Sequence, residues 1–167
     1  VVGKGGHEFT IYKFRTMYHN NDDTIHKQAI KRFLDGQSLD AVNEKGNLRP
    51  VYKLVHDPRI TPFGRFLRKT GFDEIPQFLN VIKGNMSVVG PRPPLYYEYK
   101  HYKDYHKRRL EVLPGITGWY QVKGRSQVTF EEMVDLDLEY IRNRSFWLDL
   151  KIIMMTPWVM ITGRGAH

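Results

Sequence analysis

The sequence predicts a mostly helical α/β protein with a few short strands, folded as one compact domain over residues 1–167. Length is the first reason, because 167 residues suit a single domain with a hydrophobic core. Composition is the second, because 41% hydrophobic and 26% charged residues are typical of a globular chain. Periodicity is the third, because apolar residues recur at helical spacing in several segments that glycine and proline separate.

The N-terminal part predicts two short strands and one helix. Residues 7–18 alternate and are rich in aromatic and β-branched side chains, which favours a strand. Residues 23–35 carry apolar side chains at helical spacing, and Gly36 ends this helix. A second short strand is expected at residues 51–54, within an otherwise polar stretch.

The centre of the chain predicts two helices and an extended segment. Pro62 starts the first helix and Gly71 ends it. The second helix is expected to have Asp73 as its N-cap and Gly84 as its end. Its apolar face would comprise Ile75, Phe78, Leu79 and Ile82. Three prolines require an extended backbone over residues 87–94.

Two further helices are predicted in the second half. Residues 95–113 read as one helix, which Pro114–Gly115 ends. A capping box at Thr129–Glu132 starts the next helix, which runs to about Arg142. Asp137 is the odd member of its apolar inner face.

The last segment, residues 146–161, is apolar and allows two interpretations. Trp147 and Trp158 near its ends are typical of a helix lying in a membrane interface. A buried terminal helix fits the same residues. A membrane-spanning helix is not predicted, because Asp149 and Lys151 interrupt an apolar run that is already too short.

Composition narrows the classes of function. The chain has no cysteine, which excludes disulfides, thiolate metal sites and cysteine nucleophiles. This is consistent with a reducing cytoplasmic location. The formal charge of +8 favours polyanionic partners such as phosphorylated substrates, anionic lipid or nucleic acid. No secretory signal precedes the first predicted strand.

The adjacent carboxylates Asp73 and Glu74 are the strongest candidates for chemistry. An acidic pair at a helix start is commonly only a cap. Arg68 shortly before the pair, and Arg92 between prolines after it, favour a phosphoryl-transfer site, because arginine binds phosphate with two parallel hydrogen bonds. One carboxylate can hold a metal ion while the other attacks phosphorus, and Mg²⁺ suits such oxygen ligands. Both carboxylates are therefore candidate Mg²⁺ ligands.

Other basic residues are weaker candidates for binding phosphate. Arg125 lies in a glycine-containing loop, where an arginine is usually a solvated surface group. Lys13 and Arg15 alternate on the first predicted strand, so both side chains would share one face. The histidines lack the spacing of a metal site: His101 and His106 are five residues apart, which is off one face of a helix.

Several motifs occur in order along the chain. They are Lys13-Phe14-Arg15-Thr16-Met17, Arg68-Lys69-Thr70-Gly71-Phe72-Asp73-Glu74-Ile75-Pro76-Gln77, Gly84-Asn85-Met86-Ser87-Val88-Val89-Gly90-Pro91-Arg92-Pro93, Pro114-Gly115-Ile116-Thr117-Gly118-Trp119 and Ser145-Phe146-Trp147-Leu148-Asp149-Leu150-Lys151-Ile152. In this order they resemble the bacterial sugar transferases of exopolysaccharide and glycan assembly. These enzymes are the monotopic phosphoglycosyl transferases, or polyprenyl-phosphate hexose-1-phosphate transferases. The resemblance runs from Val2 to the C-terminus and identifies residues 1–167 as the catalytic domain.

The resemblance implies a reaction. A UDP-sugar binds with Mg²⁺, and Asp73 attacks the sugar-bearing phosphate, so that UMP leaves and a phosphosugar-aspartyl intermediate remains. Polyprenyl (undecaprenyl) phosphate then attacks this intermediate and becomes a polyprenyl-diphosphate sugar. Glu74 would help to hold Mg²⁺.

The resemblance also assigns residues to the substrate site. Arg92 and Arg125 match the family's phosphate-binding arginines, and Arg68 matches the basic residue before the acidic pair. Asp137 and Asp149 fall at recurrent acidic positions. Departures from the family pattern, such as Tyr120 and Lys123, lie outside this set and bear on which sugar fits.

The resemblance implies a monotopic protein on the cytoplasmic face of the bacterial inner membrane. In this family a re-entrant hydrophobic helix precedes the first strand, and the chain is expected to begin just after that anchor. Amphipathic helices would then rest on the anionic cytoplasmic leaflet. The expected partners are a UDP-sugar, polyprenyl phosphate and this leaflet, with no nucleic acid, and a homo-oligomer stays open.

The main alternative is a basic nucleic-acid-binding module. Net charge and the tyrosine- and lysine-rich segment at residues 96–103 permit phosphate contacts and base stacking. A nucleic-acid module leaves the Asp73–Glu74 pair unexplained. A third possibility is a scaffold on the membrane surface without catalysis.

Overall fold

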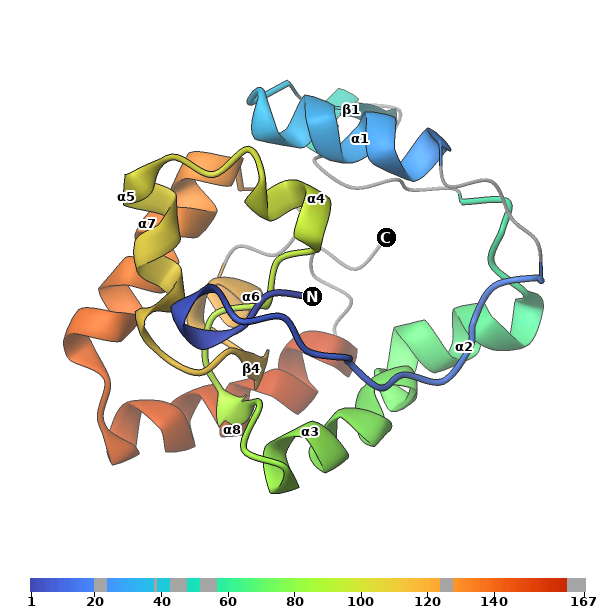
Figure 1. The fold of residues 1–167 in the computed structure, drawn as a ribbon. Helices are drawn as coiled ribbons and strands as arrows, with labels where there is room; N and C mark the ends of the chain where they lie inside the picture. The colour runs from blue at the N-terminus through green and yellow to red at the C-terminus, as the bar shows by residue number, and fades with distance from the viewer. Residues whose placement is uncertain (20–23, 38, 43–47, 52–56, 124–127, 162–167) are drawn as a thin grey trace.

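The computed structural model describes residues 1–19, 24–37, 39–42, 48–51, 57–123 and 128–161. It confirms a mostly helical domain with short strands (Figure 1). The α-helices are α1 (Thr24–Leu34), α2 (Pro62–Thr70), α3 (Phe78–Ile82), α4 (Tyr96–Tyr99), α5 (Asp104–Lys107), α6 (Trp119–Lys123), α7 (Phe130–Asn143) and α8 (Phe146–Ile161). The 3₁₀-helices are η1 (Lys4–Gly6), η2 (Phe72–Gln77) and η3 (Arg108–Glu111). The strands are β1 (Leu39–Val42), β2 (Leu48–Val51), β3 (Ser87–Val89) and β4 (Gly115–Thr117).

A pair of parallel strands forms the centre of the domain. β3 and β4 pair with Ser87 opposite Gly115 and Val89 opposite Thr117. Just beyond β3 the backbones approach so closely that a side chain on Gly90 would lie 2.5 Å from the carbonyl oxygen of Leu113. Only glycine permits this approach. The crossover between the two strands contains α4, α5 and η3, so the fold here is a parallel unit with helices over the connection.

The hydrophobic core consists of two clusters on either side of α7. One cluster gathers side chains of α6, α7 and the crossover: Tyr102, Tyr120, Phe130, Met133, Val134 and Leu138. The other joins α6 and α7 to β3 and α8: Val89, Trp119, Val122, Tyr140 and Ile152. α6 and α7 contribute side chains to both clusters and so join them. The N-terminus of α7 has the predicted capping box, in which Thr129 Oγ1 accepts from the amide of Glu132.

The prediction of a strand at residues 7–18 is wrong. Among the described residues, this segment forms no ladder and takes part in two isolated bridges, Val2 with Glu8 and Met17 with Ile60. It runs from the middle of the molecule towards α2 (Figure 1). Helical elements rather than strands lie beside it: the amide of Phe14 donates to the carbonyl of Asp73 in η2. Side-chain alternation alone does not show which partner an extended segment will find.

The prediction of one helix at residues 95–113 is also wrong. α4 ends after one turn, and Lys103 adopts an extended backbone with φ −72° and ψ 165° before α5 begins. This break turns Tyr102 into the core, where its side chain is 6% exposed. The burial of Tyr102 overrides the helical tendency of the segment.

The other helix predictions are confirmed with changes at their ends. α1, α2 and α8 lie where they were expected, and Gly36, Gly71 and Gly84 all have positive φ. β1 and β2 pair antiparallel, and β2 reaches the first residue of the strand expected at residues 51–54, whose other residues lie outside the described part of the chain. Within the described part of the chain, none of the helices has the length and apolar character needed to cross a membrane.

Candidate functional site

The acidic pair lies at a bend between two helices. Gly71 ends α2 in the left-handed conformation (φ 71°, ψ 9°) and the chain re-enters helical backbone at Phe72. Asp73 is therefore inside η2 and is not the helix N-cap that the sequence predicts, since Gly71 holds that position. Asp73 does not cap the helix and faces inward, with 7% of the residue exposed, whereas Glu74 is partly exposed.

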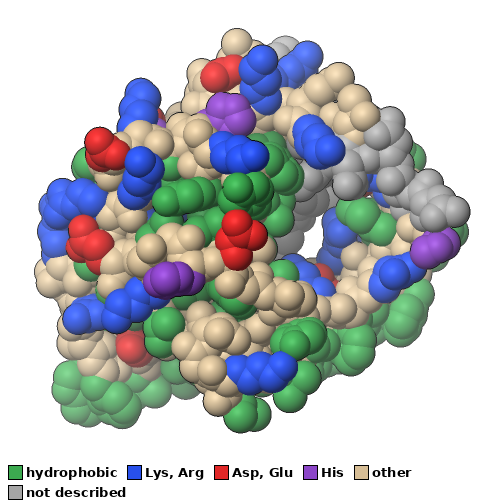
Figure 2. Space-filling view, viewed as in Figure 1, with side chains coloured by type: hydrophobic (Ala, Val, Ile, Leu, Met, Phe, Trp, Pro, Cys, Tyr) green, Lys and Arg blue, Asp and Glu red, His purple; other side chains and the backbone are tan. Residues whose placement is uncertain are grey.

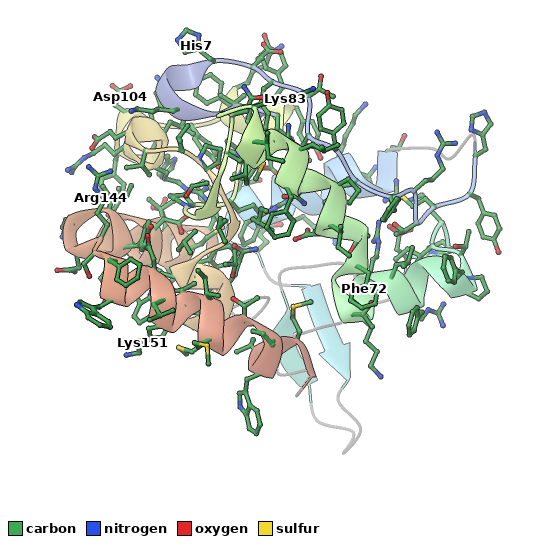
Figure 3. All side chains as sticks on the ribbon, turned by 90° about the horizontal axis from the view of Figure 1, so that it is seen from below. His7, Phe72, Lys83, Asp104, Arg144 and Lys151 are labelled. Atoms are coloured by element: carbon green, nitrogen blue, oxygen red, sulfur yellow. The ribbon has the colours of Figure 1, made fainter. Side chains whose placement is uncertain are left out.

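The unit formed by η2 and α3 is amphipathic, but its polar side is buried and its apolar side is exposed. Its buried side chains are polar: Asp73, Gln77 and Asn80. Its exposed large side chains are apolar: Phe72, Ile75, Phe78, Leu79 and Ile82, of which Ile82 is 81% exposed. The predicted apolar face thus exists but does not pack into the core. Figure 3 looks at this side and shows Phe72 at the bend between α2 and α3.

Lys13 joins the extended N-terminal segment to the acidic pair. Its Nζ donates to Glu74 Oε1 at 2.7 Å and lies 3.7 Å from Asp73 Oδ2. Burial raises the pKa of the Asp73 carboxyl, the Lys13 ammonium opposes this rise, and the Glu74 charge adds to it. The Lys13 ammonium therefore lies beside both carboxylates. Because Glu74 is partly exposed, solvent can reach this group.

Arg68 and Arg15 lie near this pair but face different partners. Arg68 Nε donates to Thr16 Oγ1 at 2.8 Å, and its positive charge lowers the pKa of Asp73 in part. Arg15 Nη1 contacts His19 Nδ1 at 2.7 Å. The described contacts therefore bring Lys13, Arg68 and the acidic pair together and turn Arg15 to His19.

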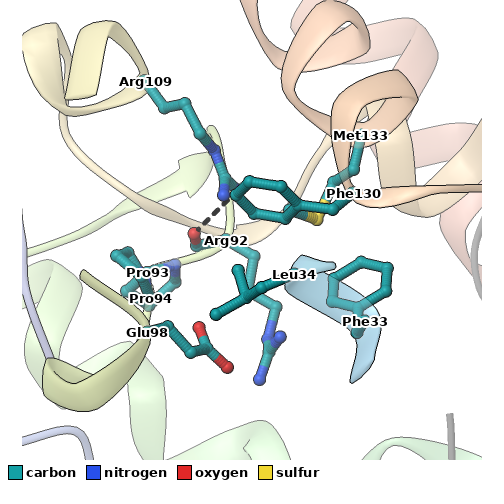
Figure 4. A pocket seen from close by; sticks show the side chains of 9 residues that line it. All are labelled: Phe33, Leu34, Arg92, Pro93, Pro94, Glu98, Arg109, Phe130 and Met133. Carbon is teal, nitrogen blue, oxygen red and sulfur yellow. Dashed lines mark hydrogen bonds between the residues drawn. The ribbon is translucent and has the colours of Figure 1, made fainter. Parts of the chain in front are cut away.

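Arg92 belongs to a second group of side chains around a small pocket. Arg92 comes from the proline-fixed segment after β3 and lines this pocket with Glu98 of α4 and Arg109 of η3 (Figure 4). Phe33 of α1 lies at its side (Figure 4). Arg109 Nη2 donates to the carbonyl of Arg92 at 3.2 Å, so the backbone of Arg92 is held by a second arginine.

Asp137 forms a buried ion pair with Arg109. The two side chains are each 1% exposed, and Arg109 Nη2 lies 2.6 Å from Asp137 Oδ2. Arg109 Nη1 also donates to the hydroxyl of Tyr102 at 2.8 Å. Burial raises the pKa of Asp137 to about 6, and the Arg109 charge opposes the rise. In the described contacts Asp137 therefore neutralises Arg109. Its expected part in substrate binding stays a prediction.

The two remaining expected site residues differ in what is known of them. Asp149 in the first turn of α8 accepts a hydrogen bond from the Tyr140 hydroxyl at 2.8 Å, which joins α8 to α7. Arg125 lies outside the described residues.

Sequence reasoning missed Arg109 and Asn80. Arg109 sits in a basic stretch, Lys107-Arg108-Arg109, in which nothing distinguishes the buried arginine from its exposed neighbour. Asn80 is fully buried, and its position seven residues after Asp73 placed it on the same face of a helical unit. That spacing was the one available signal.

The donor set at the acidic pair suits a hard divalent cation with few protein ligands. The structure places no third acidic or histidine side chain with the pair in a metal-binding cluster, as far as the described residues extend. Mg²⁺ commonly binds one or two carboxylates and completes its shell with water and phosphate oxygens. The residues present therefore fit Mg²⁺ bound together with a phosphorylated ligand.

Comparison with known proteins identifies the family. A family model described as "Bacterial sugar transferase" matches residues 1–163. The chain belongs to this family. The matched region contains the Asp73–Glu74 pair, Arg68, Arg92 and all of α7 and α8.

The family assignment is supported by relatives that match nearly all of the chain. Galactosyl transferase CpsE of Streptococcus agalactiae serotype III is 46% identical over 166 residues, covering 99% of this chain and 34% of that protein. The uncharacterized sugar transferase EpsL of Bacillus subtilis is 40% identical over 165 residues, covering 99% and 69%. Undecaprenyl-phosphate galactose phosphotransferase of Salmonella typhimurium is 39% identical over 166 residues, covering 99% and 33%. The chain thus spans about a third of the length of CpsE and of the Salmonella protein.

Proposed function

We propose that this chain transfers a sugar 1-phosphate from a UDP-sugar to undecaprenyl phosphate, releasing UMP and starting the assembly of an exopolysaccharide. Family membership supports the reaction class. The names of two relatives point to the acceptor: the Salmonella phosphotransferase, and UDP-glucose:undecaprenyl-phosphate glucose-1-phosphate transferase of Xanthomonas campestris, which is 39% identical over 174 residues. The observation that carries the proposal is the buried Asp73 carboxylate beside Glu74, with Lys13 against both.

The proposed chemistry proceeds by two displacements at one phosphorus atom. A carboxylate oxygen of Asp73 attacks the sugar-bearing phosphorus, and the bond from this phosphorus to the oxygen bridging to UMP breaks, so UMP leaves with that oxygen. An oxygen of undecaprenyl phosphate then attacks the same phosphorus and returns the carboxylate to Asp73. Burial of Asp73 excludes water from the nucleophile, which protects the phosphosugar-aspartyl intermediate from hydrolysis.

The neighbouring cationic side chains would neutralise the negative charge of the substrate phosphates. Lys13, which contacts the acidic pair, would also meet the phosphate oxygens there, and Arg68 would add a second positive charge near Asp73. Arg92 and Arg125 are proposed to bind the diphosphate, which suits the paired donors of a guanidinium. Glu74, with Asp73 beside it, would hold Mg²⁺. When bound, Mg²⁺ would neutralise part of the charge that develops on the phosphates.

The exposed apolar face is proposed to rest on the anionic cytoplasmic leaflet of the bacterial membrane. Large apolar side chains that gather on one side of a domain commonly mark a surface that meets a partner or a membrane. In Figure 2 hydrophobic side chains gather along the lower edge, over α8, α3 and α2. The most exposed among them are Phe63, Phe66, Ile82, Phe146, Trp147, Met154 and Trp158. Exposed lysines such as Lys69, Lys83 and Lys151 on the same elements would attract anionic headgroups.

This arrangement accounts for the inverted amphipathic unit. Phe72 and Ile75 would face lipid while Asp73, between them in sequence, faces inward. The nucleophile would thus lie close to the depth at which a lipid presents its phosphate. The acceptor would not need to leave the membrane surface.

The first half of the reaction offers the direct test. The chain is incubated with Mg²⁺ and each of several UDP-sugars, without lipid, and UMP release is measured together with the mass of the intact protein. We expect one UMP per protein and a mass increase of one sugar phosphate with the correct donor. Adding undecaprenyl phosphate in vesicles should remove the adduct and allow turnover. Absence of UMP release with every donor, with and without the lipid, would contradict the proposal.

A further inference from the structure

Asn80 is a buried polar side chain that the proposed chemistry does not use directly. It lies in α3, is 0% exposed, and follows the acidic pair on the same helical unit. Its Nδ2 donates to the carbonyl of Thr10 at 2.7 Å, and its Oδ1 accepts from the amide of Tyr12 at 3.1 Å. A carbonyl can only accept and an amide can only donate, so these partners define which end of the side chain is oxygen.

Through these bonds Asn80 pairs with the N-terminal segment as a neighbouring strand would. One side-chain amide bonds the carbonyl and the amide of residues two apart, which is the spacing of a β-ladder. The strand partner that the segment lacks is thus replaced by a single side chain. Because successive side chains of an extended segment point to opposite faces, a slip of one residue would turn Lys13 away from η2.

Further contacts agree with the same register. Lys83 Nζ donates to the Tyr12 hydroxyl at 2.7 Å and lies 4.7 Å from the centre of its ring. The amide of Phe14 donates to the carbonyl of Asp73 at 3.0 Å. Lys13 lies between these two contacts and reaches Glu74 at 2.7 Å. Asn80 itself is 0% exposed, so an unmatched end of its side-chain amide would be costly.

We propose that Asn80 is a positioning residue, which sets the register of the extended segment so that Lys13 lies on the Asp73–Glu74 pair. The inference rests on the proposed function of that pair. It assigns a role in catalysis to a residue that touches neither substrate nor the reacting carboxylates. Asn80 acts on turnover entirely through the position of Lys13, and the backbone bond between Phe14 and Asp73 reports the same register.

Hydrogen exchange tests the positioning without reference to activity. Asn80→Ala and Asn80→Asp, which has nearly the same size but as a carboxylate cannot donate to Thr10, should both lose protection at the Phe14 amide at a pH where the new carboxyl is ionised, while the amides of α7 keep theirs. Loss at Tyr12 alone would be a local defect. Retained protection of Phe14 in both variants would therefore overturn the proposal. The Asp variant keeps the side-chain volume and so remains informative if the Ala variant does not fold.

A double-mutant cycle then links the register to turnover. We expect Asn80→Ala to lower UMP release by roughly ten- to a hundredfold, as a misplacement of about 1 Å does. In a Lys13→Met background the same substitution should add at most about twofold, because both act through one contact. Equal losses in the two backgrounds would overturn the proposal. Asn143→Ala, which removes an asparagine bond to the Glu139 carbonyl in α7, is the matched control and should keep wild-type turnover.

The two parts of the proposal fail in different ways. If Lys13→Met leaves turnover intact while Phe14 loses protection in the Asn80 variants, the positioning stands and the proposed function of Lys13 fails. If Lys13→Met abolishes turnover and Phe14 remains protected, the proposed function stands and the positioning by Asn80 fails.

Discussion

Lys13 Nζ lies 2.7 Å from Glu74 Oε1, which joins two residues 61 positions apart in the chain. This contact brings the only lysine of the N-terminal motif against the carboxylate pair. Replacing it tests whether the ammonium assists the transfer or only neutralises the pair.

Lys13→Met is expected to lower the rate of UMP release by roughly a hundredfold, because a cation placed where charge develops is worth about that much. Lys13→Arg should recover part of the loss. Thermal unfolding should change little, since the lysine side chain is 41% exposed. A Met variant with normal turnover would show that the cation has no part in the reaction.

Substitutions of Asp73 and Glu74 are expected to have different effects on the reaction. Asp73→Asn should reduce turnover by about a thousandfold or more and form no adduct in intact-mass spectra, because an amide is a poor nucleophile. Glu74→Gln should still form the adduct but require a higher Mg²⁺ concentration for half-maximal rate. An adduct in the Asn variant would place the nucleophile elsewhere.

The Arg109–Asp137 pair is expected to behave as a structural ion pair. Asp137→Leu should lower the free energy of unfolding by about 3–5 kcal/mol, because it leaves the buried Arg109 guanidinium without the oxygens it binds. Replacing both, Arg109→Met with Asp137→Leu, should keep stability near the wild-type value. Denaturant unfolding of the three proteins measures this, and equal losses in the single and double variants would contradict it.

The same pair predicts a dependence on pH. Burial raises the pKa of Asp137 from 3.8 to about 6, so the folded state binds its proton more tightly than the unfolded state does. The stability that this group contributes is therefore complete below pH 3.8 and is lost as the pH rises through about 6. The stability of the wild type relative to the double variant should fall over this range. A difference that grows with pH would show that Arg109 dominates.

Gly71 is expected to be sensitive to any side chain. Its φ is +71°, and a Cβ would overlap with Cε of Met160 in α8. Gly71→Ala should cost about 1–2 kcal/mol of stability through backbone strain, because the end of the flexible Met160 side chain can move aside. Gly84→Ala is the matched control: its φ is +75° with no atom within 4 Å of the added Cβ, so the same strain of about 1–2 kcal/mol is expected. A clearly larger loss at Gly71 than at Gly84 would show that Met160 does not move aside.

Membrane binding is expected to depend on the exposed apolar face. Trp147→Ser together with Ile82→Ser should weaken co-sedimentation with vesicles of anionic lipid by about tenfold or more, since each removes a large apolar side chain. Tyr96→Ser on α4 removes an exposed aromatic ring from another part of the surface and should have no effect. Unchanged binding of the double variant would show that another surface meets the membrane.

Much of the secondary structure follows from local signals. The capping box at Thr129–Glu132 begins α7, and the glycines after α1, α2 and α3 end these helices where expected. Such signals act within one turn, so a sequence displays them completely. The break between α4 and α5 carries no such signal, because the burial of Tyr102 in a distant cluster causes it.

The candidate site likewise combines features that local sequence patterns predict with features that depend on packing. Local patterns were enough to predict two adjacent carboxylates near the start of a helical unit, with basic residues and a proline-fixed arginine nearby, and the ordered motifs were enough to identify the family. Which of these groups meet depends on packing: Lys13 reaches the pair, Arg15 faces His19, and Asp137 pairs with Arg109. Packing also leaves the apolar face of η2 and α3 exposed. The difference is one of range, because caps and periodicity depend on neighbours in the chain, whereas register and charge pairing depend on contacts between segments far apart in it.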